Sequence, residues 1–116
     1  MCNTSCIQFV AKHFANKDIT DLSFLEVGSY IVNGTARHFI ERKKPKEYIG
    51  VDMVAGPGVD VMCNCTELQK HFGSKRFDVV ISTEMLEHVK DWKVAILNMM
   101  TVCKPGGLLI ITTRSK

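Results

Sequence analysis

The feature that most constrains the fold is a regular alternation of short apolar runs with stretches of helical periodicity. The run at 77–83 has an uninterrupted apolar centre, Val79-Val80-Ile81, which is typical of a parallel strand covered on both faces. Four other runs also read as strands, and four segments before or between the strands carry helical spacing or helix start and stop signals. The predicted strands are 23–28, 47–52, 58–62, 77–83 and 108–113, and the predicted helices are 4–15, 35–43, 66–72 and 84–103, the last with a break near 90–91.

This alternation predicts an α/β fold built from parallel βαβ units in one domain spanning residues 1–116. Right-handed crossovers put helices on both faces of such a sheet. Ligands of these folds bind at the carboxyl ends of the strands, near the point where the strand order reverses. We therefore expect the loops after the first four strands to line one crevice.

Composition excludes several classes of protein. Hydrophobic residues make up 46% of the chain and charged residues 23%, which excludes a disordered chain. The net charge of +3 is too weak to indicate nucleic-acid binding, and the basic cluster at 42–46 is typical of a solvated helix end. No apolar run approaches the roughly 18 residues of a membrane span, and the first residues do not resemble a secretion signal.

The five cysteines are expected to be reduced thiols of a cytoplasmic protein. The pairs Cys2/Cys6 and Cys63/Cys65 lack the paired C-x-x-C spacing of a zinc site. A metal site built from Cys63, Cys65 and His71 is a disfavoured alternative.

Two loops carry the first indications of a binding site. Gly28 ends the first strand, where a missing side chain lets a ligand approach the backbone, and Asn33-Gly34 forms a turn leading into the next helix. Asp52 ends the second strand 24 residues later, near the interval at which an acidic residue binds ribose hydroxyls. The full G-x-G-x-x-G spacing is absent, which disfavours a nicotinamide-dependent oxidoreductase.

The next two loops each allow two interpretations. Asn64 could hydrogen-bond the edge of a base through its amide, or it could cap the helix that begins at residue 66. Glu84, Glu87 and His88 lie on one helical face, where they could hold a divalent metal or supply a general base. A solvated first helical turn, favoured by the helix dipole, is the preferred interpretation over a metal site, so none is predicted.

Five motifs in order resemble the class I S-adenosylmethionine-dependent methyltransferases, and most closely the group called methyltransferase domain 11. The resemblance covers about residues 23–113. It implies a Rossmann-like three-layer sandwich with a mostly parallel sheet of about five strands in the order 3-2-1-4-5. The family sheet has seven strands, so by this resemblance we expect the sheet of these 116 residues to lack the terminal antiparallel hairpin. The motifs are LEVGSYIVNG, YIGVDM, VDVMCN, FDVVISTEMLEHVKDW and VCKPGGLLIITT.

The resemblance also implies roles for individual residues. Residues at the end of the first strand and in the loop after it face the methionine part of the cofactor, and Asp52 binds the ribose. Met53, after the second strand, and Asn64 and Cys65, after the third strand, contact the adenine. The end of the fourth strand lies beneath the reactive methyl group, and His88 or Glu84 is the candidate base. The implied cofactor-binding residues are Glu26, Gly28, Ser29, Asp52, Met53, Asn64, Cys65 and Ser82.

The implied function is methyl transfer from S-adenosylmethionine to a small-molecule acceptor. An alternative is a truncated or partner-dependent cofactor-binding core without independent activity. It is motivated by the apolar fifth strand, which would present an open sheet edge. We expect a second copy of the chain or a partner to cover that edge.

Overall fold

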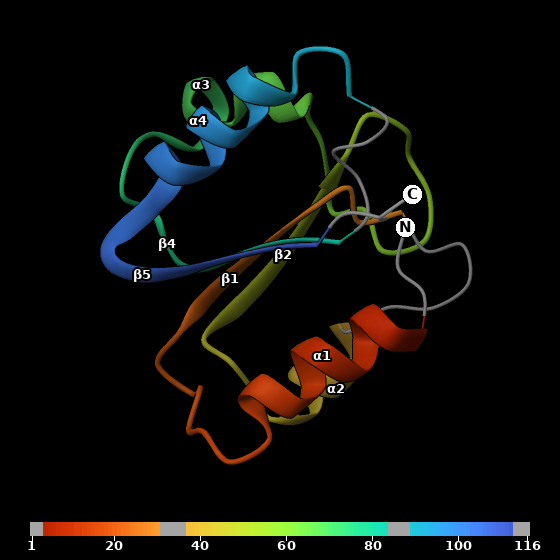
Figure 1. Ribbon diagram of the computed structural model, residues 1–116, viewed down its shortest axis with the longest axis vertical. Coiled ribbons are helices and arrows are strands. Elements are labelled where there is room, and N and C mark those ends of the chain that lie inside the picture. Colours follow the sequence, from red (N-terminus) through yellow and green to blue (C-terminus); the bar gives the residue numbers. More distant parts are fainter. Residues whose placement is uncertain (1–3, 31–36, 84–88, 113–116) are drawn as a thin grey trace.

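The computed structural model describes residues 4–30, 37–83 and 89–112, which form one parallel sheet with helices on both faces (Figure 1). The strand order is β3-β2-β1-β4-β5, which confirms the predicted order. Within the described ranges, no helix has the length and apolar character needed to cross a membrane. The elements are α1 (Thr4–Phe14), β1 (Ser23–Val27), α2 (Arg37–Arg42), β2 (Glu47–Asp52), β3 (Val61–Met62), the 3₁₀ turn η1 (Cys65–Glu67), α3 (Leu68–Phe72), β4 (Phe77–Thr83), α4 (Trp92–Val102) and β5 (Cys103–Thr112).

The sheet separates two apolar layers, as the alternation of side chains along its strands requires. Helices α1 and α2 cover one face, and α3 and α4 cover the other (Figure 1). All five residues of the central strand β1 are buried. The α1/α2 layer contains Val10, Phe14, Ile19, Phe24, Ile40, Tyr48, Val79, Ile81 and Ile110, and the α3/α4 layer contains Leu25, Val27, Val51, Leu68, Phe77, Val80, Ala95, Met99 and Val102.

The two edge strands differ most from their predicted extents, and β1 ends one residue early, at Val27. β3 is limited to Val61–Met62, because the preceding residues form a turn in which the amide of Val59 donates to the carbonyl of Gly56. β5 begins five residues earlier than predicted, at Cys103, directly after α4. The segment 104–107 is absorbed by a register shift between the pairs Phe77–Cys103 and Val79–Leu108.

The helices follow the predictions where they are described. Residues 90–91 form a turn before α4, at the position of the predicted break, and residues 84–88, which would form the first part of that helix, lie outside the described part of the chain. The described part of the second helix is Arg37–Arg42, and Thr35, predicted to open it, is also outside. The predicted helix at 66–72 consists of the turn η1 followed by α3.

Candidate functional site

The loop after β1 lies directly against the tip of β2. Gly28 adopts φ 78°, a left-handed conformation that favours glycine, and turns the chain out of the strand. The amides of Gly28 and Ser29 both donate to the carbonyl of Val51, at 2.9 and 3.0 Å. The amide of Tyr30 donates to Oδ2 of Asp52 at 3.1 Å. The two segments that the sequence singled out for binding are therefore in contact.

Asp52 presents a partly exposed carboxylate at this junction. Its Oδ1 accepts hydrogen bonds from the amides of Met53, at 2.7 Å, and Val54, at 3.4 Å. A carboxylate offers about four lone-pair positions, so these amide bonds fix its orientation without using all of its acceptor capacity. The side chain of Met53 beyond it is 64% exposed. The group can therefore accept hydroxyl donors from a ligand that lies over the sheet edge.

A small cavity of about 100 Å³ opens beside Asp52, at the carboxyl ends of the strands. Its lining comes from the loops after β1, β2 and β3 and from the segment that follows β4, as the topology predicts. Five of its lining residues belong to or pack against the apolar α3/α4 layer. The lining residues are Val27, Gly28, Val51, Asp52, Met53, Cys63, Cys65 and Val89.

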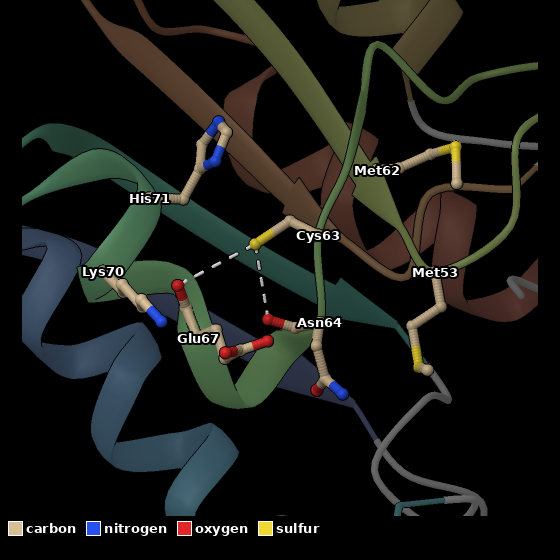
Figure 2. A pocket seen from close by; sticks show the side chains of 7 residues that line it. All are labelled: Met53, Met62, Cys63, Asn64, Glu67, Lys70 and His71. Atoms are coloured by element: carbon tan, nitrogen blue, oxygen red, sulfur yellow. Dashed lines mark hydrogen bonds between the residues drawn. The ribbon is translucent and has the colours of Figure 1, made fainter.

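A larger hollow of about 590 Å³ adjoins this cavity on the β3 side (Figure 2). Met53 and Cys63 line both spaces. Its volume lies in the range of small-molecule sites. Together the two spaces form a crevice from the tip of β1 to α3. The hollow is lined by Met53, Met62, Cys63, Asn64, Glu67, Lys70 and His71.

Asn64 caps the turn η1, which was one of its two predicted roles. Its Oδ1 accepts hydrogen bonds from the amide and the hydroxyl of Thr66, at 3.0 and 2.9 Å. Asn64 also lines the larger hollow, so contact between its amide and a base edge stays a prediction.

The two cysteines of this loop are free thiols. Burial raises the pKa of Cys63, and the charge of Glu67 adds to that shift. Burial likewise raises the pKa of Cys65. Both side chains are therefore neutral, weakly polar lining groups at neutral pH. In the described residues, no three His, Cys, Asp or Glu side chains come together as a metal site, and this includes Cys63, Cys65 and His71.

Glu26 lies beneath the loops rather than among the residues that line the two spaces. It is 5% exposed, and its Oε1 accepts a hydrogen bond from the hydroxyl of Tyr48 at 2.8 Å. Burial raises the pKa of Tyr48 well above its usual range, and the negative charge of Glu26 raises it further. Tyr48 is therefore a protonated donor at neutral pH, and it holds one oxygen of Glu26 in place.

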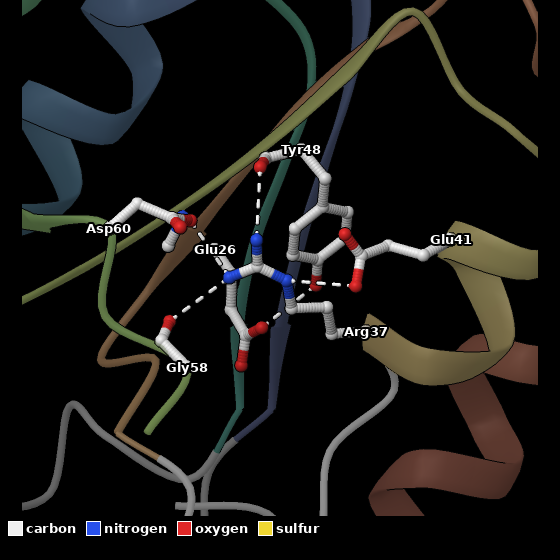
Figure 3. A network of polar contacts seen from close by, with 7 residues as sticks. Glu26, Arg37, Glu41, Tyr48, Gly58 and Asp60 are labelled. Atoms are coloured by element: carbon white, nitrogen blue, oxygen red, sulfur yellow. Dashed lines mark hydrogen bonds and ion pairs between the residues drawn. The ribbon is translucent and has the colours of Figure 1, made fainter. Parts of the chain in front are cut away.

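Arg37 forms a polar network that sequence reasoning did not find (Figure 3). Its Nη1 contacts Oδ2 of Asp60 at 2.8 Å and the carbonyl of Gly58 at 3.2 Å, and its Nε contacts Glu41 at 3.1 Å. Burial opposes the charge, but these hydrogen bonds outweigh it, so the pKa of Arg37 is raised. The sequence offered one signal for this network. Asp60 lies two positions after the turn Gly56-Pro57-Gly58, and the segment 53–60 contains no basic residue that could pair with it.

Two buried serines lie at the ends of strands that border the crevice, Ser29 after β1 and Ser82 near the end of β4. Ser29 is 2% exposed and Ser82 is 0% exposed. In the described part of the chain, neither hydroxyl has a hydrogen-bond partner. Buried hydroxyls are usually satisfied, so each is a group that a bound molecule or water can pair with. The remaining predicted residues after β4, Glu84, Glu87 and His88, lie outside the described residues.

Comparison with known proteins identifies the family. A family model for a methyltransferase domain matches residues 3–116, which is nearly the whole chain. The chain belongs to the methyltransferase domain family. This confirms the resemblance to class I methyltransferases drawn from the five motifs.

Solved structures share the fold at low identity. The YcgJ protein from Bacillus subtilis superposes with a TM-score of 0.71 at 18% identity, covering 90% of this chain and 48% of that one. The trans-methyltransferase CalH, solved in complex with SAH, gives a TM-score of 0.64 at 19% identity, covering 90% of this chain and 34% of that one.

Curated relatives match a shorter stretch. Ubiquinone biosynthesis O-methyltransferase from Rhodopseudomonas palustris is 33% identical over 52 residues, which are 45% of this methyltransferase domain and 20% of that protein. The corresponding protein from Rickettsia typhi is 40% identical over 48 residues, 41% of this chain and 20% of that protein. The matched stretch is thus about a fifth of each curated relative's length.

Proposed function

We propose that this methyltransferase domain binds S-adenosylmethionine in the crevice at the carboxyl ends of β1 to β4 and transfers its methyl group to a small molecule. The observation that carries the proposal is the junction between the loop at Gly28 and the strand end at Asp52, which both line one small cavity. A glycine turn beside an acidic strand end suits a ligand with an amino-acid tail and a ribose. The SAH complex of CalH supports the same ligand class.

In this proposal, each group of residues contacts a different part of the cofactor. The loop that begins at Gly28 and Ser29 lies along the amino-acid part, and the carboxylate of Asp52 accepts the two ribose hydroxyls. Met53 and Cys65 lie against the adenine, and Asn64 approaches its edge. Glu26 lies buried beneath the loop after β1 and supports that loop rather than lining the crevice.

The sulfonium of the cofactor carries an activated methyl group, so the protein mainly has to align the acceptor and exclude water. Ser82 lies at the end of β4, beneath the reacting centre, and its buried hydroxyl provides a polar contact there. Glu84 and His88 follow β4 in the sequence and are the proposed bases that accept the proton of the acceptor. The O-methyltransferase names of the curated relatives favour a hydroxyl acceptor. A cytoplasmic location is part of the proposal.

Isothermal calorimetry with S-adenosylhomocysteine tests the binding site. Asp52→Asn removes the charge but keeps a side chain that accepts amide hydrogen bonds. We expect it to weaken binding by about tenfold to a hundredfold, because hydrogen bonds to a charged group contribute about 1.5–3 kcal/mol.

Asp21→Ala is the matched control, because Asp21 is an exposed acid two residues before the opposite end of β1. Its affinity should stay within about twofold of the unmodified chain, which is about 0.4 kcal/mol. Equal affinities of the Asp52 and Asp21 variants would remove Asp52 from the site.

A second candidate is a cofactor-binding core whose activity depends on another chain. β5 is at the edge of the sheet, and several large apolar side chains of the adjacent α4 are exposed, including Leu97 at 61% and Met100 at 56%. We propose that a second copy or a partner covers this edge. Light scattering tests this, since a monomer at all concentrations that turns over substrate unaided would exclude both the second copy and the dependence on a partner.

A further inference from the structure

The loop between β2 and β3, residues 53–60, carries a proposed adenine contact but has little regular structure of its own. Three contacts hold it from below. The ring of Tyr30 packs so closely on Gly56 that a Cβ there would come within 2.2 Å of it. A Cβ on Gly50 would likewise come within 2.2 Å of the carbonyl of Gly58. The third contact is the guanidinium of Arg37.

Arg37 ties the loop to the body of the sheet. Its Nη1 contacts the carbonyl of Gly58 and the carboxylate of Asp60, while its Nη2 contacts the carbonyl of Tyr48 at 3.4 Å (Figure 3). The guanidinium also lies 5.0 Å from the centre of the Tyr48 ring. One side chain, 14% exposed, therefore joins the last part of the loop to strand β2.

Asp60 joins the end of the loop to β2 through its carboxylate and its backbone amide. Its Oδ2 accepts from the amide of Gly50 at 2.8 Å as well as from Arg37, and its own amide donates to the carbonyl of Gly50 at 2.9 Å. The carboxylate is thus shared between the middle of β2 and the first residue of α2. The contacts of Arg37 and Asp60 fix the end of the loop whose start is Asp52-Met53.

We propose that Arg37 and Asp60 form a clamp that positions loop 53–60 and thereby sets the affinity of the crevice for the adenosine part of its ligand. The inference rests on the proposed function. Neither residue lines the cavity or the adjoining hollow, so both are positioning residues that act through the loop.

The clamp is tested by Arg37→Met, with Arg76→Met as the matched control. Arg76 forms an ion pair with Glu47, the first residue of β2, at the end of that strand remote from the crevice. Arg76→Met breaks the pair with Glu47, whereas Arg37→Met breaks the pairs with Asp60 and Glu41 and the contacts with the two carbonyls. Calorimetry with S-adenosylhomocysteine and with 5′-methylthioadenosine, which lacks the amino-acid tail, gives the readout.

We expect Arg37→Met to weaken both ligands by about tenfold and Arg76→Met to change neither by more than about twofold. Arg37→Lys should recover part of the loss, because an ammonium can pair with Asp60 but cannot also reach both carbonyls. Asp60→Asn, which can still accept from the Gly50 amide, should give a smaller loss of about threefold and serves if Arg37→Met does not fold. Affinities equal to that of Arg76→Met in every clamp variant would overturn the proposal.

Hydrogen exchange separates failure of the clamp from failure of the proposed function. The amides of residues 53–60 should exchange faster in Arg37→Met than in Arg76→Met, whether or not a ligand is present. If the unmodified chain binds neither ligand, the proposed function and the affinity role of the clamp both fail. Equal exchange in the two variants shows that Arg37 does not hold the loop and overturns the clamp on its own.

Discussion

Replacing Tyr48 with phenylalanine isolates one buried hydrogen bond beneath the site. The ring of Tyr48 stacks on Phe24, with centroids 5.8 Å apart and an interplanar angle of 14°, and phenylalanine keeps that packing. What is lost is the hydroxyl that donates to the carboxylate of Glu26 at 2.8 Å. Because Glu26 is 5% exposed, water does not readily replace the missing donor.

The expected cost of Tyr48→Phe is about 2 kcal/mol, within the range of about 1.5–3 kcal/mol for a hydrogen bond to a charged group. A domain of 116 residues loses about 4 °C in Tm for each kcal/mol, so the transition should fall by about 8 °C. Guanidinium denaturation should show a lower midpoint with an unchanged m-value, because the surface exposed on unfolding stays the same.

Tyr30→Phe is the control for this measurement. In the described part of the chain, the hydroxyl of Tyr30 forms no hydrogen bond, while its ring packs on Gly56 in both forms. We expect its free energy of unfolding to change by less than about 0.5 kcal/mol. A Tyr48→Phe variant as stable as Tyr30→Phe would refute the reasoning, because it would mean that the Glu26 carboxylate does not depend on that donor.

Three other predictions concern the free energy of unfolding. Burial raises the pKa of Asp60, but its bonds from Arg37 and from the Gly50 amide outweigh burial and lower it. The contribution of the Asp60 carboxylate to the free energy of unfolding is therefore present above the ordinary pKa of about 4, and it is lost as the pH falls through the lower pKa of the folded state. Asp60→Asn should therefore make the denaturation midpoint depend less on pH between about pH 5 and pH 2. Gly50→Ala should cost more than about 2 kcal/mol in urea denaturation, because the added Cβ meets a backbone carbonyl. Met99→Ala should cost about 2–5 kcal/mol, since Met99 is fully buried, whereas Leu97→Ala, two positions away and 61% exposed, should cost less than about 1 kcal/mol; equal midpoints for those two variants would contradict the assignment of the α4 core face.

The central strands could be predicted from the sequence because burial on both faces leaves a local signature. The ranges of β2 and β4 agree with the prediction, and β1 differs by one residue. These strands are short and mainly apolar, and β4 has a continuous apolar centre at Val79-Val80-Ile81. The edge strands differ because their extents depend on neighbours. Only Val61–Met62 pair with β2, and β5 gains its early start from Cys103 pairing with Phe77.

The loops at the strand ends could be predicted from the sequence, but the buried polar contacts that support those loops could not. The contact between the loop that begins at Gly28 and the end of β2 at Asp52 follows from topology, because the carboxyl ends of adjacent parallel strands meet at one edge. The bond from Tyr48 to Glu26 depends on strand register, which pairs Glu26 with Gly50, two residues along β2 from Tyr48. The Arg37–Asp60 pair joins residues 23 positions apart, and a strand-and-loop pattern does not reveal such a separation.

The residues that line the cavity and the residues that support its loops lie on opposite faces of the sheet. The cavity is lined by Val27, Val51 and other residues of the α3/α4 layer, so we expect substitutions there to change the affinity for a ligand by direct contact. The network of Glu26, Tyr48 and Arg37 lies on the α1/α2 side, where Tyr48 is part of the apolar layer. None of these three residues lines the cavity or the hollow, so we expect the network to act on a ligand through the loops after β1 and β2. A chain of this kind can therefore change the fit of its binding loops without altering a single lining residue, because the loops are held from the opposite face of the sheet.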